Sequence, residues 1–492
     1  MKIRTVGALA ALGMLLTSYS VWSLTADRAR PNSGWVHHAG TDRGDDRGRP
    51  NEASLASFTA NGTLGMDARL GHAKLPAGET QETFVLVNVR ADDKVSGRPT
   101  SRHLAIVVDR SGSMRGKRMQ NAIAAAQGAV RRLADGDIVS VVDYAGFGHV
   151  LVEPTELGPD TREAVSARIG RLAADGDTCI SCGLDTALDL LRRRTGGVDR
   201  VLLVSDGEAT TGVRDIEGMR RVADRVRATG ATVTTIGVDV DYNERMMTAI
   251  AEQTNGRHYF VQEPSALASI FDQELSGLER TVAREAKVEL ELEPGVELLD
   301  VGGRSFRREG SRVSVALGSF AAGEERSVLA RVRLASSGGA EQPIVRARLT
   351  YDDLTTGTRG ESDGSLTALL TSDGTRSPLE PHVEESVQRS GSVTALNDAA
   401  DLFKAGDSEG AKQKVAQKLE EVRERRAAAV AAAPAPARPA LSSRFDQEEV
   451  ALGAAASAFA EPPPAPTASP AEVRESKAAL KRNAAQAAEL AF

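Results

Sequence analysis

Apolar and polar residues follow two different patterns along this chain. Between residues 101 and 282, apolar runs such as His103–Val108 alternate with stretches in which apolar residues recur every three or four positions. Strands that alternate with amphipathic helices predict a mostly parallel sheet covered by helices on both faces. We expect the strands at residues 103–108, 138–144, 198–205, 231–238 and 257–261.

The segments on either side of this region have a different period. Residues 53–100 and 283–360 contain alternating runs such as Phe84–Val89, separated by turns with Gly and Pro. A period of two is typical of strands with one buried face. We interpret the two segments as halves of one β-sandwich. The predicted fold class is therefore α/β, with a doubly wound, Rossmann-like sheet inserted in a β-sandwich.

The C-terminal part of the chain is helical and then rich in Ala and Pro. Residues 377–428 have helical periodicity with a break at Gly406-Asp407, which predicts a helical hairpin. We interpret this hairpin as a structural appendage rather than a repeat-like protein-binding unit. Residues 429–492 are expected to form a disordered low-complexity tail, because Ala/Pro-rich sequences of this kind do not bury a core.

The N-terminal segment has the features of an export signal. Lys2 and Arg4 precede an uncharged stretch that ends at Ala26, so residues 1–26 are interpreted as a signal peptide or, if uncleaved, a membrane anchor. The polar residues 27–52 are expected to be a flexible linker. The protein is therefore expected in the periplasm or cell envelope, with membrane attachment through the N-terminal segment as the alternative to cleavage.

The charge balance bears on the class of partner. The chain has 61 Lys and Arg against 68 Asp and Glu, for a net charge of −7, and no sustained basic stretch. This composition excludes the electrostatic footprint of a nucleic-acid-binding protein.

Candidate chemistry lies where the predicted strands end. Asp109-Arg110-Ser111-Gly112-Ser113 directly follows the first buried strand, and Asp206 follows another. Thr178 lies in a loop before a helix. Carboxylate and hydroxyl oxygens suit Mg²⁺ or Mn²⁺, and the carboxyl ends of parallel strands share one rim of a sheet. The pentapeptide alone is equally compatible with a helix cap.

Together these motifs resemble the metal-ion-dependent adhesion site (MIDAS) of the von Willebrand factor type A (VWA) family, over residues 101–282. The resemblance implies that Ser111 and Ser113 bind the cation directly and Thr178 directly or through water. Asp109 and Asp206 would act through waters and hydrogen bonds. A Glu or Asp of a protein partner would complete the shell. The expected function is then an exported adhesion or scaffold protein, not an enzyme.

The two cysteines, Cys179 and Cys182, directly follow Thr178. Export favours a local disulfide that stiffens this loop, whereas Cys-x-x-Cys at a helix start also resembles a thiol-disulfide exchange motif. Enzymatic alternatives are therefore a thiol-disulfide oxidoreductase, or a metal-assisted hydrolase with Glu208 as the base. A further alternative is that the metal serves only the stability of the fold.

Overall fold

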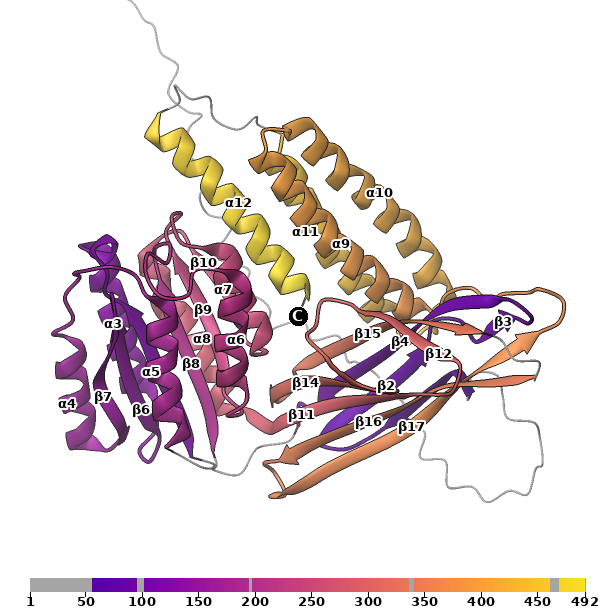
Figure 1. Ribbon diagram of the computed structural model, residues 1–492, viewed down its shortest axis with the longest axis horizontal. Coiled ribbons are helices and arrows are strands. Elements are labelled where there is room, and N and C mark those ends of the chain that lie inside the picture. The colour runs from indigo at the N-terminus through magenta and orange to yellow at the C-terminus, as the bar shows by residue number, and fades with distance from the viewer. Residues whose placement is uncertain (1–54, 95–100, 194–196, 336–339, 461–468, 492) are drawn as a thin grey trace, which may run out of the picture.

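The computed structural model of the protein contains three sheets and a group of long helices (Figure 1). The segments predicted as signal or anchor (1–26) and linker (27–52) lie outside the residues that it describes. The described residues are 55–94, 101–193, 197–335, 340–460 and 469–491.

The central domain is built on a six-stranded sheet with the order β10-β9-β8-β5-β6-β7. Neighbouring strands are parallel except β6 and β7, which form an antiparallel edge. The strands are β5 (Arg102–Asp109), β6 (Ile138–Tyr144), β7 (Gly148–Glu156), β8 (Val198–Ser205), β9 (Thr232–Val238) and β10 (His258–Val261).

Helices cover both faces of this sheet. Alternate residues of β5 enter two separate apolar cores, Leu104 and Ile106 on one face, Ala105 and Val107 on the other. This explains why β5 is apolar without interruption from Leu104 to Val108, and it confirms the predicted doubly wound fold. The first core contains α3 (Lys117–Arg132), α4 (Pro159–Ile169) and α8 (Leu267–Glu279); the second contains α5 (Ile180–Arg192), α6 (Ile216–Arg227) and α7 (Glu244–Gln253).

The strand order reverses beside β5. The chain passes from β5 through α3 to β6 on one side and later returns to β8 on the other side. In open α/β sheets the loops diverge at such a point and leave room for a ligand at the carboxyl ends of the strands. Asp109, the last residue of β5, stands at this point.

The flanking segments form two packed sheets around one apolar core. The two segments are paired directly, because β4 before the central domain and β15 after it are antiparallel neighbours. β17 continues to Thr371, beyond the expected boundary at 360, since its alternation is carried by small and polar residues. One sheet contains β1 (Ser57–Ala60), β2 (Leu64–Leu70), β4 (Thr80–Ala91), β15 (Glu325–Ala335) and β12 (Val296–Val301), and the other β13 (Arg307–Glu309), β14 (Arg312–Ala321), β11 (Thr281–Leu292), β16 (Glu341–Asp353), β17 (Thr358–Thr371) and β3 (Lys74–Pro76).

The predicted disordered tail at 429–492 is wrong for most of its length. The described residues there form α11 (Arg438–Ala458) and α12 (Pro470–Ala491), which pack with α9 (Pro381–Lys404) and α10 (Ser408–Ala432). Proline is compatible with a helix in its first turn, and Pro439 and Pro470 occupy such positions. Alanine is the best helix former, and alanines here form a shared core with Phe445 and Phe403.

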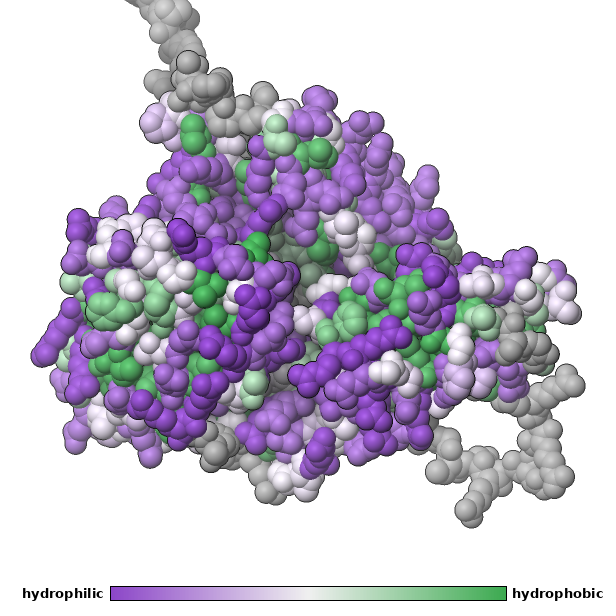
Figure 2. Space-filling model, in the orientation of Figure 1, coloured by the Kyte–Doolittle hydropathy of each residue, from purple (hydrophilic) through white to green (hydrophobic). Residues whose placement is uncertain are grey.

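α12 lies between the central domain and the other helices (Figure 1) and contacts α9, α11, α7 and β10. The face shown in Figure 2 is predominantly hydrophilic, with apolar residues confined to separate patches. Within the described ranges, no helix combines the length and apolar character needed to cross a membrane.

Candidate metal centre

Asp109 is buried in the site and accepts hydrogen bonds from its own loop and from the neighbouring strand β8. Its Oδ1 accepts a hydrogen bond from the Ser111 backbone N–H at 2.8 Å, and its Oδ2 accepts one from the Ser205 hydroxyl at 2.7 Å. Burial raises the pKa of Asp109 to about 6, while these hydrogen bonds oppose the shift. The carboxylate is thus held in one orientation by the strand next to it and by its own loop.

The two serines of the motif lie together on a single helical turn. Ser111 Oγ is 3.0 Å from Ser113 Oγ, and Ser113 donates a hydrogen bond to Asp206 Oδ1 at 2.7 Å. Two ligands on adjacent corners of a Mg²⁺ octahedron are about 3 Å apart, given Mg–O distances of about 2.1 Å. The two hydroxyls therefore already have the spacing of adjacent Mg²⁺ ligands.

Asp206 connects this loop to a residue that the sequence motif does not include. Arg118, in the first turn of α3, donates from Nη1 to Asp206 Oδ2 at 2.7 Å and from Nη2 to Asp239. Burial raises the pKa of Asp206, and the hydrogen bonds from Ser113 and Arg118 oppose that shift. One positive charge is therefore shared by two carboxylates at the rim.

Arg118 and Asp239 were missed by sequence reasoning. Asp239 directly follows β9, the parallel neighbour of β8, so a carboxylate after a third strand was a signal that could have been noticed. The contacts of Arg118 could not be predicted from the sequence, because only the tertiary fold brings α3 next to the ends of β8 and β9.

The loop with Thr178 is tied to both other loops of the site. Gly176, which has a left-handed φ of 89°, accepts a hydrogen bond through its carbonyl from Gly112 N–H at 3.0 Å. Thr178 N–H donates to Thr210 Oγ1 at 2.9 Å, and the Thr178 carbonyl accepts from Thr210 N–H at 2.9 Å. A shift of any one loop would therefore act on the other two.

Gly207 leaves open the space between the hydroxyls. A Cβ at this position would lie 3.5 Å from Ser113 Oγ and 3.7 Å from Thr178 Oγ1. The two hydroxyls thus border one small volume that a side chain would fill. This cradle fits a hard cation held by neutral oxygen ligands.

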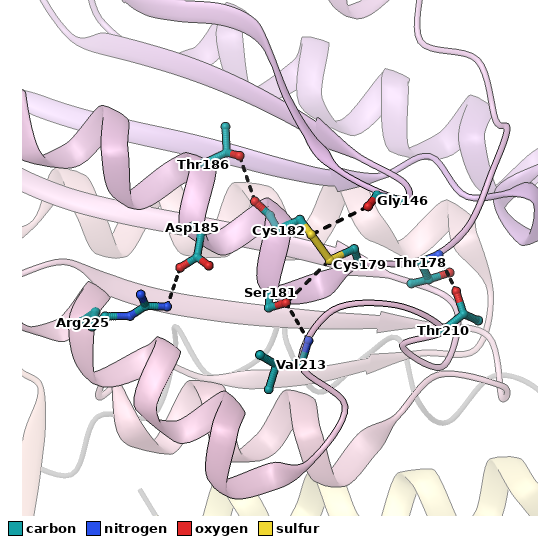
Figure 3. The surroundings of a disulfide bond; sticks show 10 residues. All are labelled: Gly146, Thr178, Cys179, Ser181, Cys182, Asp185, Thr186, Thr210, Val213 and Arg225. Carbon is teal, nitrogen blue, oxygen red and sulfur yellow. Dashed lines mark hydrogen bonds and ion pairs between the residues drawn. A yellow bond between two sulfur atoms is a disulfide. The ribbon is translucent and has the colours of Figure 1, made fainter.

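A disulfide joins Cys179 and Cys182 at the start of α5 (Figure 3). Cys179 is buried, and its N–H donates to the carbonyl of Ala145 at 2.7 Å. Gly212, with a left-handed φ of 71°, packs so closely that a Cβ there would lie 2.4 Å from Cys179 Sγ. The disulfide thus lies between two loops of the rim and contacts both, the β6–β7 turn and the segment after Asp206.

The structure brings all five predicted ligands, Asp109, Ser111, Ser113, Thr178 and Asp206, to one rim of the sheet. The site is not a cluster of acidic and imidazole side chains: among the described residues, no group of three or more His, Cys, Asp or Glu is placed to hold a metal ion. Its inner donors are hydroxyls, as the sequence motif predicts, and its carboxylates are engaged in hydrogen bonds.

An exposed aromatic side chain stands beside the cradle. Phe147, at the β6–β7 turn, is 62% exposed, the Arg110 guanidinium carbon is 5.9 Å from its ring centroid, and Arg110 also pairs with Asp143 at 2.5 Å. Exposed aromatics next to a charged site are typical of protein-binding surfaces.

Comparison with known proteins identifies the central domain. A model of the von Willebrand factor type A domain family matches residues 103–273. The uncharacterized protein YfbK of Escherichia coli K12 is 29% identical over 218 residues, which cover 44% of this chain and 38% of YfbK. The chain thus matches about two-fifths of that relative's length. The uncharacterized protein sll0103 of Synechocystis is 25% identical over 339 residues, 66% of this chain and 79% of that relative.

Solved structures resemble more than the central domain. A von Willebrand factor type A protein from Catenulispora acidiphila superimposes with a TM-score of 0.65 at 19% identity, covering 80% of this chain and 91% of its own. The ArnB paralog VWA2 from Sulfolobus acidocaldarius gives a TM-score of 0.54 at 16% identity, covering 81% and 98%. At these identities the likeness concerns the fold.

Proposed function

Residues 103–273 form a von Willebrand factor type A domain, and from that premise we propose that the protein binds a partner protein through a divalent cation held at the rim of this domain. VWA domains commonly mediate protein interactions or adhesion. The cation would be Mg²⁺, or Mn²⁺, and the partner would present an Asp or Glu. We propose a binding function, without catalysis.

The observation that carries this proposal is the hydroxyl-lined cradle. Ser111, Ser113 and Thr178 would hold the ion with neutral oxygens, while Asp109 and Asp206 orient the serines through hydrogen bonds. When bound, the ion supplies positive charge and an open coordination position. Because Arg118 already neutralises part of the charge of Asp206, the ion keeps much of its attraction for a carboxylate from outside.

Neither enzymatic alternative is favoured by the geometry. In a thiol-disulfide exchange motif the first cysteine must be reached by its substrate, whereas Cys179 is fully buried. Glu208 is exposed, and its carboxylate accepts a hydrogen bond from Asn243 at 2.6 Å. Those contacts suit a solvated loop residue better than a buried general base.

A location in the cell envelope is part of the same proposal. It rests on the basic and apolar pattern of residues 1–26. An exported protein would meet oxidising conditions, which suit the disulfide next to the metal site.

The test is binding to an array of peptides that contain Asp or Glu, with matched Asn or Gln peptides. We expect binding in Mg²⁺ that is lost in EDTA and lost in Asp109→Ala. Asp175→Ala is the matched control, because Asp175 is exposed on the same rim and pairs with Arg115. If the acidic peptides bind equally in EDTA, the proposal is wrong. If Mg²⁺ raises the melting temperature but no acidic peptide binds, the metal serves stability alone.

A further inference from the structure

The last helix, α12, lies against the VWA domain through basic side chains. Its buried residues are few and mostly small, among them Ala478 and Ala487. Its contacts to the domain are ionic or polar: Arg474 with Asp239 at 3.2 Å, Lys477 with Asp241 at 2.9 Å, Lys481 with Glu244 at 3.2 Å, and Arg482 with Gln262 at 2.7 Å. The pairs of Arg474 and Lys477 are partly exposed and therefore individually weak. The contacts of α12 to the domain are thus more readily broken than its packing against α9 and α11.

One of these contacts continues into the metal centre. Asp239 is buried and has a left-handed φ of 66°, and its two oxygens serve different partners. Oδ1 faces Arg474 of α12, and Oδ2 accepts from Arg118. The Nη1 group of Arg118 donates a hydrogen bond to Asp206 Oδ2, and Asp206 Oδ1 accepts one from the Ser113 hydroxyl. A continuous series of ion pairs and hydrogen bonds thus connects α12 with the hydroxyl of Ser113.

These contacts predict the direction in which a docked α12 changes the affinity of the site for a cation. A guanidinium on Asp206 competes with a cation in the cradle, since it repels the cation and occupies the carboxylate that orients Ser113. Asp239 competes with Asp206 for the guanidinium of Arg118 and so weakens the Arg118–Asp206 ion pair. Arg474 weakens that pull, because it neutralises part of the charge on Asp239.

We propose that α12 is an intramolecular regulator of the metal site, which lowers its affinity for Mg²⁺ when docked and raises it when released. Arg474, Asp239 and Arg118 are positioning residues in this scheme. The proposal rests on the proposed function only in so far as the cradle binds Mg²⁺. It adds that the C-terminal helix sets how tightly the ion is held.

The two ends of the Arg474–Asp239 pair give opposite predictions. Arg474→Ala removes a cationic partner of Asp239 and leaves it the guanidinium of Arg118 and the N–H of Val240. Mg²⁺ should then bind the full chain roughly two- to five-fold more tightly, the range of a weak ion pair. Asp239→Asn leaves Arg118 with Asp206, so Mg²⁺ should bind more weakly by a similar factor. A purely structural ion pair would shift both variants in the same direction.

The measurement is calorimetric titration of the full chain with Mg²⁺ alone. Glu475→Ala is the matched control on the same helix, since Glu475 is exposed, pairs with Arg482 of α12 itself at 2.7 Å rather than with the domain, and should leave the affinity unchanged. Because coupling is reciprocal, Mg²⁺ should also speed amide hydrogen exchange across residues 470–491 of the wild type.

The outcomes separate this inference from the proposed function. If the wild type binds Mg²⁺ but Arg474→Ala and Asp239→Asn shift the affinity in the same direction, or Arg474→Ala matches Glu475→Ala, the regulatory role is wrong and the metal site stands. If the wild type shows no Mg²⁺ binding, both proposals are wrong.

Discussion

At the scale of single residues, the site depends on a missing side chain as much as on its ligands. The sequence motif predicted Asp109, Ser111, Ser113, Thr178 and Asp206, because their order and separation fit a known pattern. It could not show that Gly207 keeps the space between two hydroxyls open, or that Arg118 occupies Asp206. Those features arise only when loops distant in sequence meet.

Gly207→Ala tests the cradle directly. The added methyl would make ordinary contacts of 3.5 and 3.7 Å, so we expect a melting temperature close to that of the wild type. It would crowd the space beside the two hydroxyls that we assign to the ion, so Mg²⁺ affinity should fall at least about tenfold. Gly128→Ala, in the middle of α3, is the control, because its Cβ would meet only the Arg131 guanidinium at 3.9 Å and should leave the Mg²⁺ affinity unchanged. Equal Mg²⁺ affinity of the wild type and Gly207→Ala would argue against this position for the ion.

The disulfide should affect binding more than stability. It closes a very short loop, which constrains the unfolded chain little, yet it lies between two rim loops next to Thr178. We expect Cys179→Ser/Cys182→Ser to lower Mg²⁺ affinity with only a small change in melting temperature. A dithiol reductant should have the same effect on the wild type and none on the double variant. A large loss of stability with unchanged affinity would contradict this role.

At the scale of elements, apolar periodicity predicted the strands and helices of the central domain. The prediction was wrong where alanine replaced larger apolar residues, since α11 forms its core contacts with Ala451 and Ala455 as well as Phe445. A stripe of alanines is hard to distinguish from low complexity in the sequence. The antiparallel strand β7 was not predicted either. It lies at the edge of the sheet and is mostly exposed or half-buried, so it too lacks a long run of large apolar residues.

The helical bundle contains a buried carboxyl that should make its stability depend on pH. Burial, and then the nearby charge of Glu385, raise the pKa of Glu448 to about 8. Arg389 and Arg444 pair with Glu385. Because the folded state binds the Glu448 proton more tightly than the unfolded state, the contribution of Glu448 to stability is fully present below about pH 4.5 and is lost as the pH rises toward 8.

The expected loss between these pH values is roughly 3–5 kcal/mol, measured by native-state hydrogen exchange in α11. Glu448→Gln should remove most of this slope. Glu449→Gln should keep it, because Glu449 pairs with Arg423 and Arg426 at the surface of the bundle. Equal slopes in the wild type and Glu448→Gln would exclude Glu448 as the source.

At the scale of the whole molecule, the sequence predicted a parallel-sheet domain inserted in a β-sandwich, because the hydrophobic period changes twice along the chain. The resemblance to the VWA family came from the motifs at the strand ends. The pairing of β4 with β15 shows how the two ends of the insertion meet. The sequence did not predict that α12 would return to the VWA domain, since helix docking through scattered polar side chains has no periodic signature. That return connects α12 with the candidate metal centre.

The central claim is that a divalent cation binds in the cradle between the three loops. Crystals of the full chain grown with Mn²⁺ test it most directly, through an anomalous difference map recorded at the Mn edge. The account predicts one strong peak bordered by Ser111, Ser113 and Thr178, absent in crystals of Gly207→Ala. A map without a peak at this rim, or with Mn²⁺ bound only elsewhere, would contradict the account.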